Sequence, residues 1–105
     1  MVISAQTRAD VVRRLNQAEA EIRGLGVRRL ALFGSFARSE PRVDSDVDLL
    51  VEFEPDQKSF DSFVRLCNLL EERLGRTVEL VTTEGLSPYI GPHILAEAED
   101  VVRVA

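Results

Sequence analysis

Cysteine, histidine and tryptophan are almost missing from this chain, which has one cysteine, one histidine and no tryptophan. A single cysteine excludes an internal disulfide and a zinc site built from several cysteines. It fits a reducing compartment, so we expect a cytoplasmic protein. No apolar run is long enough to cross a membrane. The N-terminus has no basic region followed by an apolar stretch, so we expect no signal peptide.

Positive charge is also scarce, because 13 lysines and arginines stand against 18 acids and the net charge is −5. This balance disfavours binding along a phosphate backbone, so we expect neither direct nucleic-acid binding nor a membrane partner. The charge balance does not exclude a local site that binds a phosphate group. The 105 residues, of which 45% are hydrophobic, suffice for a single domain over residues 1–105 with a modest core. The oligomeric state is not readable from these patterns.

Hydrophobic periodicity predicts alternating helices and strands. Helices are expected over residues 7–25 and 59–74, and strands over 28–34, 46–53 and 77–82. Residues 87–100 are expected to form a turn and then a short helix with Pro92 in its first turn. Residues 101–105 are either a last edge strand or a frayed end. The order predicts an α+β domain with a small mixed β-sheet flanked by helices.

Two aspartates open the apolar strand DVDLLVEF. Side chains alternate along a strand, so Asp46 and Asp48 are expected to point the same way. Two such carboxylates repel each other unless a cation lies between them, and Mg²⁺ prefers hard oxygen ligands together with substrate phosphates. Glu79 is an acid within the next apolar strand. If the two strands are neighbours, three carboxylates can hold two metal ions about 3.5–4 Å apart for an in-line phosphoryl displacement.

A glycine–serine pair follows the strand over residues 28–34. Gly34 lets the backbone approach a ligand closely. The segment SFARS is expected to open a helix, whose free N–H groups favour phosphate. Ser35 adds a hydroxyl donor, and Arg38 can donate two hydrogen bonds to a phosphate. This turn is therefore a candidate cradle for a triphosphate beside the aspartates.

Gly34-Ser35, ten further residues and then Asp46-Val47-Asp48 resemble the signature of the nucleotidyltransferase superfamily, which shares its fold with DNA polymerase beta. The short chain and its segments GSFAR, SDVDLLVEF, VELVT and LSPYIGPHILAEAE are similar to the minimal nucleotidyltransferases. Those proteins are the antitoxin halves of HEPN–MNT toxin–antitoxin pairs. The resemblance covers about residues 30–100.

The resemblance implies a role for each of these residues. It implies phosphate binding by Gly34 and Ser35, metal binding by Asp46 and Asp48, and a third carboxylate, as metal ligand or catalytic base, at Glu79. The family usually has aspartate at the position of Glu79. It often has glycine where this chain has Ser39.

The implied activity is ATP- and Mg²⁺-dependent transfer of AMP to a hydroxyl, a tyrosine, of a cognate HEPN ribonuclease toxin. The modification silences the toxin, so the protein acts as an antitoxin. A different class of function also stays open, in which a catalytically weak protein neutralises its toxin by binding alone. A third reading, a transferase acting on a small molecule or an RNA end, predicts turnover without a partner protein.

The candidate residues also have plainer interpretations. Asp46 and Asp48 can serve as charges that keep an edge strand from pairing with other chains. The Gly-Ser pair at the family spacing favours the catalytic interpretation for both. Glu79 can simply face solvent, and its sequence context leaves both interpretations open.

Overall fold

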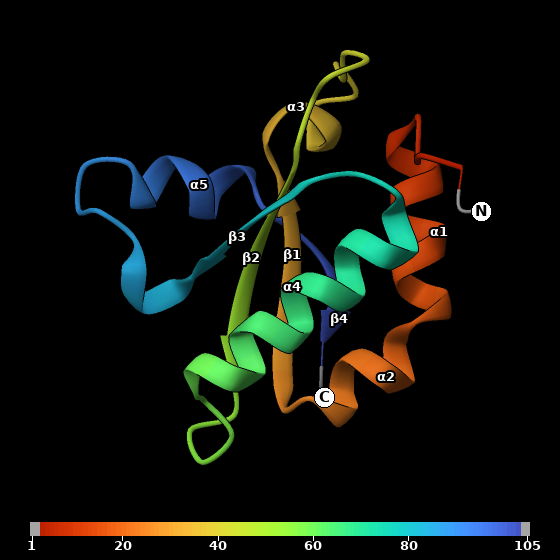
Figure 1. The fold of residues 1–105 in the computed structure, drawn as a ribbon. Helices are drawn as coiled ribbons and strands as arrows, with labels where there is room; N and C mark the ends of the chain where they lie inside the picture. Colours follow the sequence, from red (N-terminus) through yellow and green to blue (C-terminus); the bar gives the residue numbers. More distant parts are fainter. Residues whose placement is uncertain (1–2, 104–105) are drawn as a thin grey trace.

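A four-stranded mixed sheet in the order β3-β2-β1-β4 forms the centre of the computed structural model, which describes residues 3–103 (Figure 1). The strands are β1 (Val27–Phe33), β2 (Val47–Phe53), β3 (Val78–Thr82) and β4 (Glu99–Arg103). β1 pairs antiparallel with β2 and with β4, whereas β2 and β3 run parallel. The predicted α+β fold with a small mixed sheet is confirmed.

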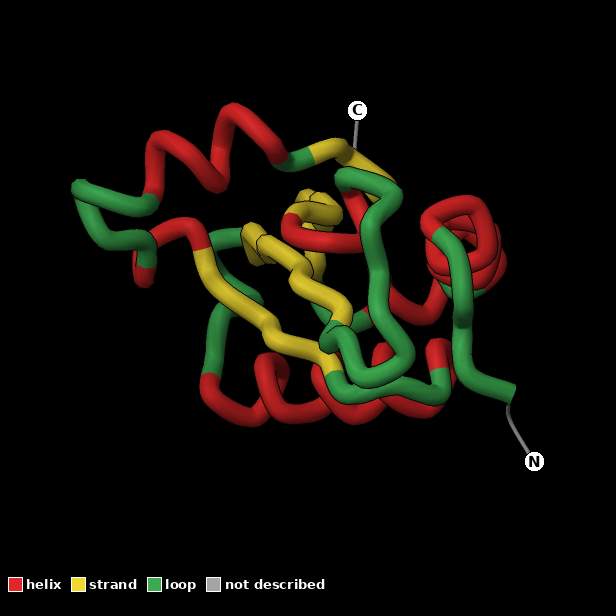
Figure 2. Tube along the Cα trace, turned by 90° about the horizontal axis from the view of Figure 1, so that it is seen from above, coloured by secondary structure: helices red, strands yellow, loops and turns green. Residues whose placement is uncertain are grey.

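Helices cover both faces of this sheet. They are α1 (Arg8–Gln17), α2 (Glu19–Gly24), α3 (Gly34–Ala37), α4 (Phe60–Leu74) and α5 (Gly91–Glu97), with a 3₁₀ turn η1 (Thr83–Gly85). α1, α2 and α4 pack on one face and α5 lies over the other (Figures 1 and 2). Among the described residues, no helix is long and apolar enough to cross a membrane.

The alternation of strand side chains divides the buried residues into two cores. The larger core packs Leu30, Leu32, Leu49 and Val51 against α1, α2 and α4. The smaller core joins Ala31, Phe33 and Leu50 to Ile94 of α5. Since Asp48 precedes Leu50 by two residues, its side chain lies on the face of α5. The same alternation places Glu79 of β3 on that face.

Local signals fix the ends of the two long helices. The Thr7 side chain accepts a hydrogen bond from the N–H of Asp10 at 3.1 Å, and Ser59 caps α4 in the same way through Ser62. Gly75 ends α4 in the left-handed conformation, at φ 64°. These are the residue types that helix starts and stops prefer.

The helix expected over residues 7–25 is interrupted at Ala18, so the prediction of one continuous helix is wrong. Ala18 has φ −96° and ψ 9°, and α2 starts anew at Glu19. The bend keeps both Leu15 and Ile22 fully buried against the sheet. Alanine is the best helix former, so the sequence carries no stop signal here. At the other end of the chain the edge-strand alternative is confirmed through residue 103, and residues 104–105 lie outside the described part.

Candidate active site

Three neighbouring strand positions meet at one end of the sheet, on the face of α5. Phe33, the last residue of β1, pairs with Asp48 of β2, and Asp48 pairs with Glu79 of β3. Gly34 therefore follows directly beside Asp48. The sheet thus brings the glycine turn and two of the expected carboxylates together, as the sequence predicts for neighbouring strands.

The carboxyl groups of Asp48 and Glu79 lie close enough to share a hydrogen bond when one of them is protonated. Burial, this hydrogen bond and the negative charge of Glu79 raise the pKa of Asp48 from its ordinary value of 3.8 to about 7. The charge of Asp46 adds to the shift, and the guanidinium of Arg38 opposes it. The site therefore carries more negative charge than its surroundings balance.

Asp46 lies just before β2 rather than within it, and its side chain is exposed. It acts on Asp48 through its charge, whereas Glu79 is in direct contact. Within residues 3–103, no three or more His, Cys, Asp or Glu side chains are grouped so that they could hold a metal ion. The sequence predicted that three carboxylates meet, whereas the structure brings two of them, Asp48 and Glu79, together. Asp46 and Glu79 are both exposed, so their side chains can turn toward Asp48 without repacking the core.

Gly34 has no room for a side chain. Its φ is 77°, in the left-handed region. A Cβ added there would lie 2.0 Å from Oδ2 of Asp48 and 2.9 Å from its Cγ. Glycine is therefore required for the turn before Ser35 to pass so close to the Asp48 carboxylate.

Arg38 caps the end of α3, one turn after Ser35, as expected. Its guanidinium pairs with Glu97 at the end of α5 and lies 3.8 Å from the carboxylate of Glu40. The side chain is 52% exposed. The guanidinium of Arg38 is therefore near enough to Asp48 to lower its pKa. The groups that it pairs with are the carboxylates of Glu97 and Glu40. The sequence patterns did not single out Glu97, because a pairing between residues so far apart leaves no local signal.

Ser39 follows α3 with φ 58°, and it is the one non-glycine residue with positive φ between residues 3 and 103. The N–H of Glu40 donates to the carbonyl of Ser35 at 2.8 Å, and the N–H of Ser39 donates to Phe36 at 3.1 Å. These two bonds form a Schellman motif, which usually has glycine at this position. The geometry gives a physical reason for a glycine there in related sequences.

Replacing Ser39 with glycine is expected to stabilise the protein by about 1 kcal/mol, because a left-handed serine is strained. The free energy of unfolding in urea measures this change. The control is Ser62→Gly within α4, where glycine should instead cost about 0.5–1 kcal/mol. Equal destabilisation by both substitutions would contradict the strain at Ser39.

The stability of the protein without metal should depend on the ionisation of Asp48. Because the folded-state pKa is raised from 3.8 to about 7, the folded state holds this proton more tightly than the unfolded chain. The stability that this proton gives is complete below about pH 4 and is lost as the pH rises to 7. The melting temperature of the wild type should therefore fall relative to Asp48→Asn across this range. Asp44→Asn, an exposed neighbour, should follow the wild type; a pH-independent difference between wild type and Asp48→Asn would contradict the shift.

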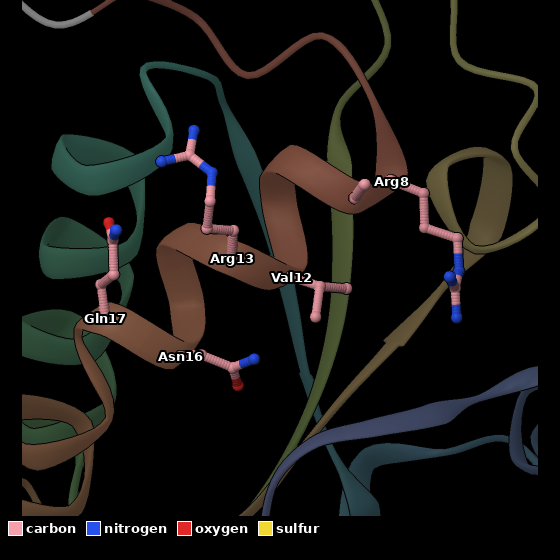
Figure 3. A pocket seen from close by; sticks show the side chains of 6 residues that line it. Arg8, Val12, Arg13, Asn16 and Gln17 are labelled. Carbon is pink, nitrogen blue, oxygen red and sulfur yellow. The ribbon is translucent and has the colours of Figure 1, made fainter.

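Two hollows on the surface of the described part of the chain differ in whether residues of the candidate site line them. One, of about 240 Å³, is lined by Asp46 and the neighbouring turn together with Arg76. The other, of about 610 Å³, runs along the outer face of α1 and is lined by Arg8, Ala9, Val12, Arg13, Asn16 and Gln17 (Figure 3). No residue expected at the site lines the second hollow, whereas Asp46 lines the first.

The fold and this site define a class of protein. The model of the nucleotidyltransferase domain family matches residues 12–101, and the chain therefore belongs to that family. Within the family it is similar to the minimal nucleotidyltransferases. A solved structure provisionally described as a minimal nucleotidyltransferase superposes with a TM-score of 0.81 and 35% identity, covering 92% of this chain and 98% of the other.

Relatives with assigned names point the same way. The chain is 46% identical over 77 residues to a Methanocaldococcus jannaschii protein provisionally named protein adenylyltransferase MJ0435, over 73% of this chain and 82% of the relative. It is 43% identical over 72 residues to the protein adenylyltransferase MntA of Thermococcus cleftensis, over 69% of this chain and 72% of the relative.

A more distant solved structure shares the fold. It is a chain in the complex of a tri-AMPylated HEPN toxin of Shewanella oneidensis with its MNT antitoxin. The TM-score is 0.62 at 17% identity, over 89% of this chain and 73% of the other. At this identity the likeness shows the fold alone.

Proposed function

We propose that this chain is a protein adenylyltransferase that transfers AMP from ATP to a tyrosine hydroxyl of a cognate HEPN toxin and so acts as an antitoxin. The observation that carries the proposal is the pairing of Asp48 with Glu79 directly beside Gly34, whose missing side chain lets the turn before Ser35 lie against the Asp48 carboxylate. The names of the two relatives above 40% identity support the activity. The toxin complex of the same fold supports the choice of partner.

Divalent metal ions fit the donor set of this site. Asp46, Asp48 and Glu79 offer the hard carboxylate oxygens that Mg²⁺ prefers. Burial and the neighbouring Glu79 raise the pKa of Asp48, so its ionised form is unfavourable here, and a bound cation would relieve that cost. We therefore assign two Mg²⁺ ions to these three residues. When bound, the ions would supply charge stabilisation for an in-line displacement at the α-phosphate of ATP, in which the acceptor oxygen bonds to the α-phosphorus and pyrophosphate leaves.

The remaining residues would bind and orient the nucleotide. Gly34 brings the backbone of the turn close to the carboxylates, and Ser35 adds a hydroxyl donor for a phosphate. Arg38 would reach the phosphates by exchanging its partner Glu97 for the triphosphate. Glu79, the more exposed member of the carboxyl pair, would accept the proton of the acceptor hydroxyl. A protein that supplies this hydroxyl would complete the site.

Intact-mass spectrometry tests the function directly. The protein, ATP, Mg²⁺ and the product of the adjacent gene would be mixed, and the mass of that product should rise by whole AMP units. Asp46→Asn should abolish the increase. Asp44→Asn, which makes the same charge change two residues earlier on an exposed side chain, should preserve it.

Other outcomes distinguish the competing functions. A stable complex with no mass change, and equal protection of the toxin by wild type and Asp46→Asn, would identify a binding-only antitoxin. AMP transfer to a small molecule or an RNA end without any partner protein would identify the third class. Peptide mapping of the modified partner would establish whether the acceptor is tyrosine.

A further inference from the structure

We propose that Arg76 is a positioning residue of the transfer site, which fixes the loop before Asp46 relative to the turn that contains Ser35. Arg76 follows the glycine that ends α4 and precedes β3. This role rests on the proposed function, because it concerns the placement of a metal-binding carboxylate. It adds a residue that no feature of the sequence singled out.

The loop before Asp46 is held by Arg76 through its backbone. Nη1 of Arg76 donates to the carbonyl oxygens of Val43 and Ser45, each at 3.0 Å. Ser45 is the residue immediately before Asp46. The loop is also closed on itself, because the N–H of Arg42 donates to Oγ of Ser45 at 2.7 Å. The guanidinium therefore sets where this short turn, and with it Asp46, lies.

The same guanidinium also contacts the helix that follows the glycine turn. Its Cζ lies 5.1 Å from the ring centre of Phe36, within the range of a cation–π contact. Phe36 is fully buried and directly follows Ser35. Nε of Arg76 donates to the carbonyl of Ala5, which ties the guanidinium to a third segment. One side chain thus links both halves of the proposed site.

The partners of Arg76 indicate that it positions backbone segments rather than neutralises a carboxylate. In the described part of the chain, its hydrogen bonds go to three backbone carbonyls, and no carboxylate is paired with it. A planar guanidinium can donate in several directions while stacking on a ring, which a lysine ammonium cannot. Because a carbonyl at each end of the turn is held by one rigid group, the turn has little freedom to shift.

Arg14 provides a matched control for the test. It too donates to backbone carbonyls, including that of Ile3 at 2.6 Å and that of Leu74 at 3.3 Å. It anchors the same N-terminal segment as Arg76 but shares none of the contacts of Arg76 with Phe36 or the loop before Asp46. Arg14→Met and Arg76→Met therefore both remove a partly buried donor to backbone carbonyls, whereas only the second is expected to loosen the site.

Two measurements on these variants test the inference. Amide hydrogen exchange of the metal-free protein over residues 43–47 should become faster in Arg76→Met and stay near wild type in Arg14→Met. The affinity for Mn²⁺ in the presence of AMP-PNP should fall about tenfold in Arg76→Met, as the loss of a net hydrogen bond or two would give. It should change less than about twofold in Arg14→Met, even if both variants melt at equally lowered temperatures.

The outcomes separate this inference from the proposed function. If wild type binds Mn²⁺ with AMP-PNP and Arg76→Met binds equally well, the positioning role is overturned while the function stands. Unchanged exchange over residues 43–47 in Arg76→Met would overturn the anchoring without reference to any metal. If the wild type itself fails to bind Mn²⁺ with AMP-PNP, the proposed function fails, and the positioning role fails with it.

Discussion

Asp48→Asn is expected to lower AMP transfer on the order of a thousandfold, while the metal-free protein becomes more stable at neutral pH. Asparagine keeps the shape of aspartate and can still donate a hydrogen bond to Glu79. It removes a charge at the point where the two carboxyl groups meet, and that charge is unfavourable without metal. With metal and nucleotide bound, the same charge should stabilise the transition state, and the loss of such electrostatic stabilisation costs about 10²–10³-fold or more.

Single-turnover AMP transfer and thermal melting at pH 7.5, each with and without Mg²⁺, measure both effects. Mg²⁺ should raise the melting temperature of the wild type, because a ligand that binds only the folded state stabilises it. It should do so less for Asp48→Asn. Asp44→Asn provides the control for a general change in net charge. Wild-type transfer by Asp48→Asn would refute the metal assignment, and a lower melting temperature without metal would refute the repulsion.

Gly34→Ala is expected to destabilise the protein by about 2 kcal/mol and to abolish nucleotide binding. A left-handed alanine alone costs roughly 1–2 kcal/mol. In addition, its Cβ would lie 2.0 Å from Oδ2 of Asp48, so the carboxylate must move away from its present position. The displaced carboxylate of Asp48 would then no longer lie beside Glu79 or in the position proposed for binding metal and phosphate.

A double-mutant cycle separates these two causes. In an Asp48→Ala background the colliding carboxylate is gone and only the Cβ of residue 48, at 3.1 Å, stays close, so Gly34→Ala should cost mainly the backbone strain. Gly24→Ala in α2, where an added Cβ meets no atom within 4 Å, should leave stability unchanged or raise it by up to about 1 kcal/mol. An equal cost of Gly34→Ala with and without the Asp48 carboxylate would show that the contact has no part in the effect.

The sequence was sufficient for the parts of the fold that local patterns determine. Apolar spacing located the strands to within a residue or two, and Ser59 and Gly75 marked the ends of α4. The pairing of Asp48 with Glu79 was predictable once their strands were taken as neighbours. The bend at Ala18 was not, because a helix-favouring residue is held there in a non-helical conformation by tertiary packing.

The parts of the site that the sequence did not predict depend on contacts between distant segments. Arg38 was expected at a phosphate, yet it pairs with Glu97, which is brought to it by α5 folding over the sheet. Arg76 reaches the carbonyl of Ala5 and the turn before Asp46, and carbonyl partners leave no trace in side-chain patterns. Asp46 was assigned to the strand, and it lies one residue outside, where the loop rather than the pleat sets its direction.

The mixed directions of the strands determine the order in which this site can be assembled during folding. β1 and β2 are antiparallel neighbours along the chain, so Gly34 and Asp48 meet when one short loop closes, at a small entropic cost. β3 runs parallel to β2, and that pairing requires α4 to cross the sheet first. Glu79 should therefore reach Asp48 late, after the hairpin, so the chain is not exposed to repulsion between these two carboxylates until most of its apolar surface is buried.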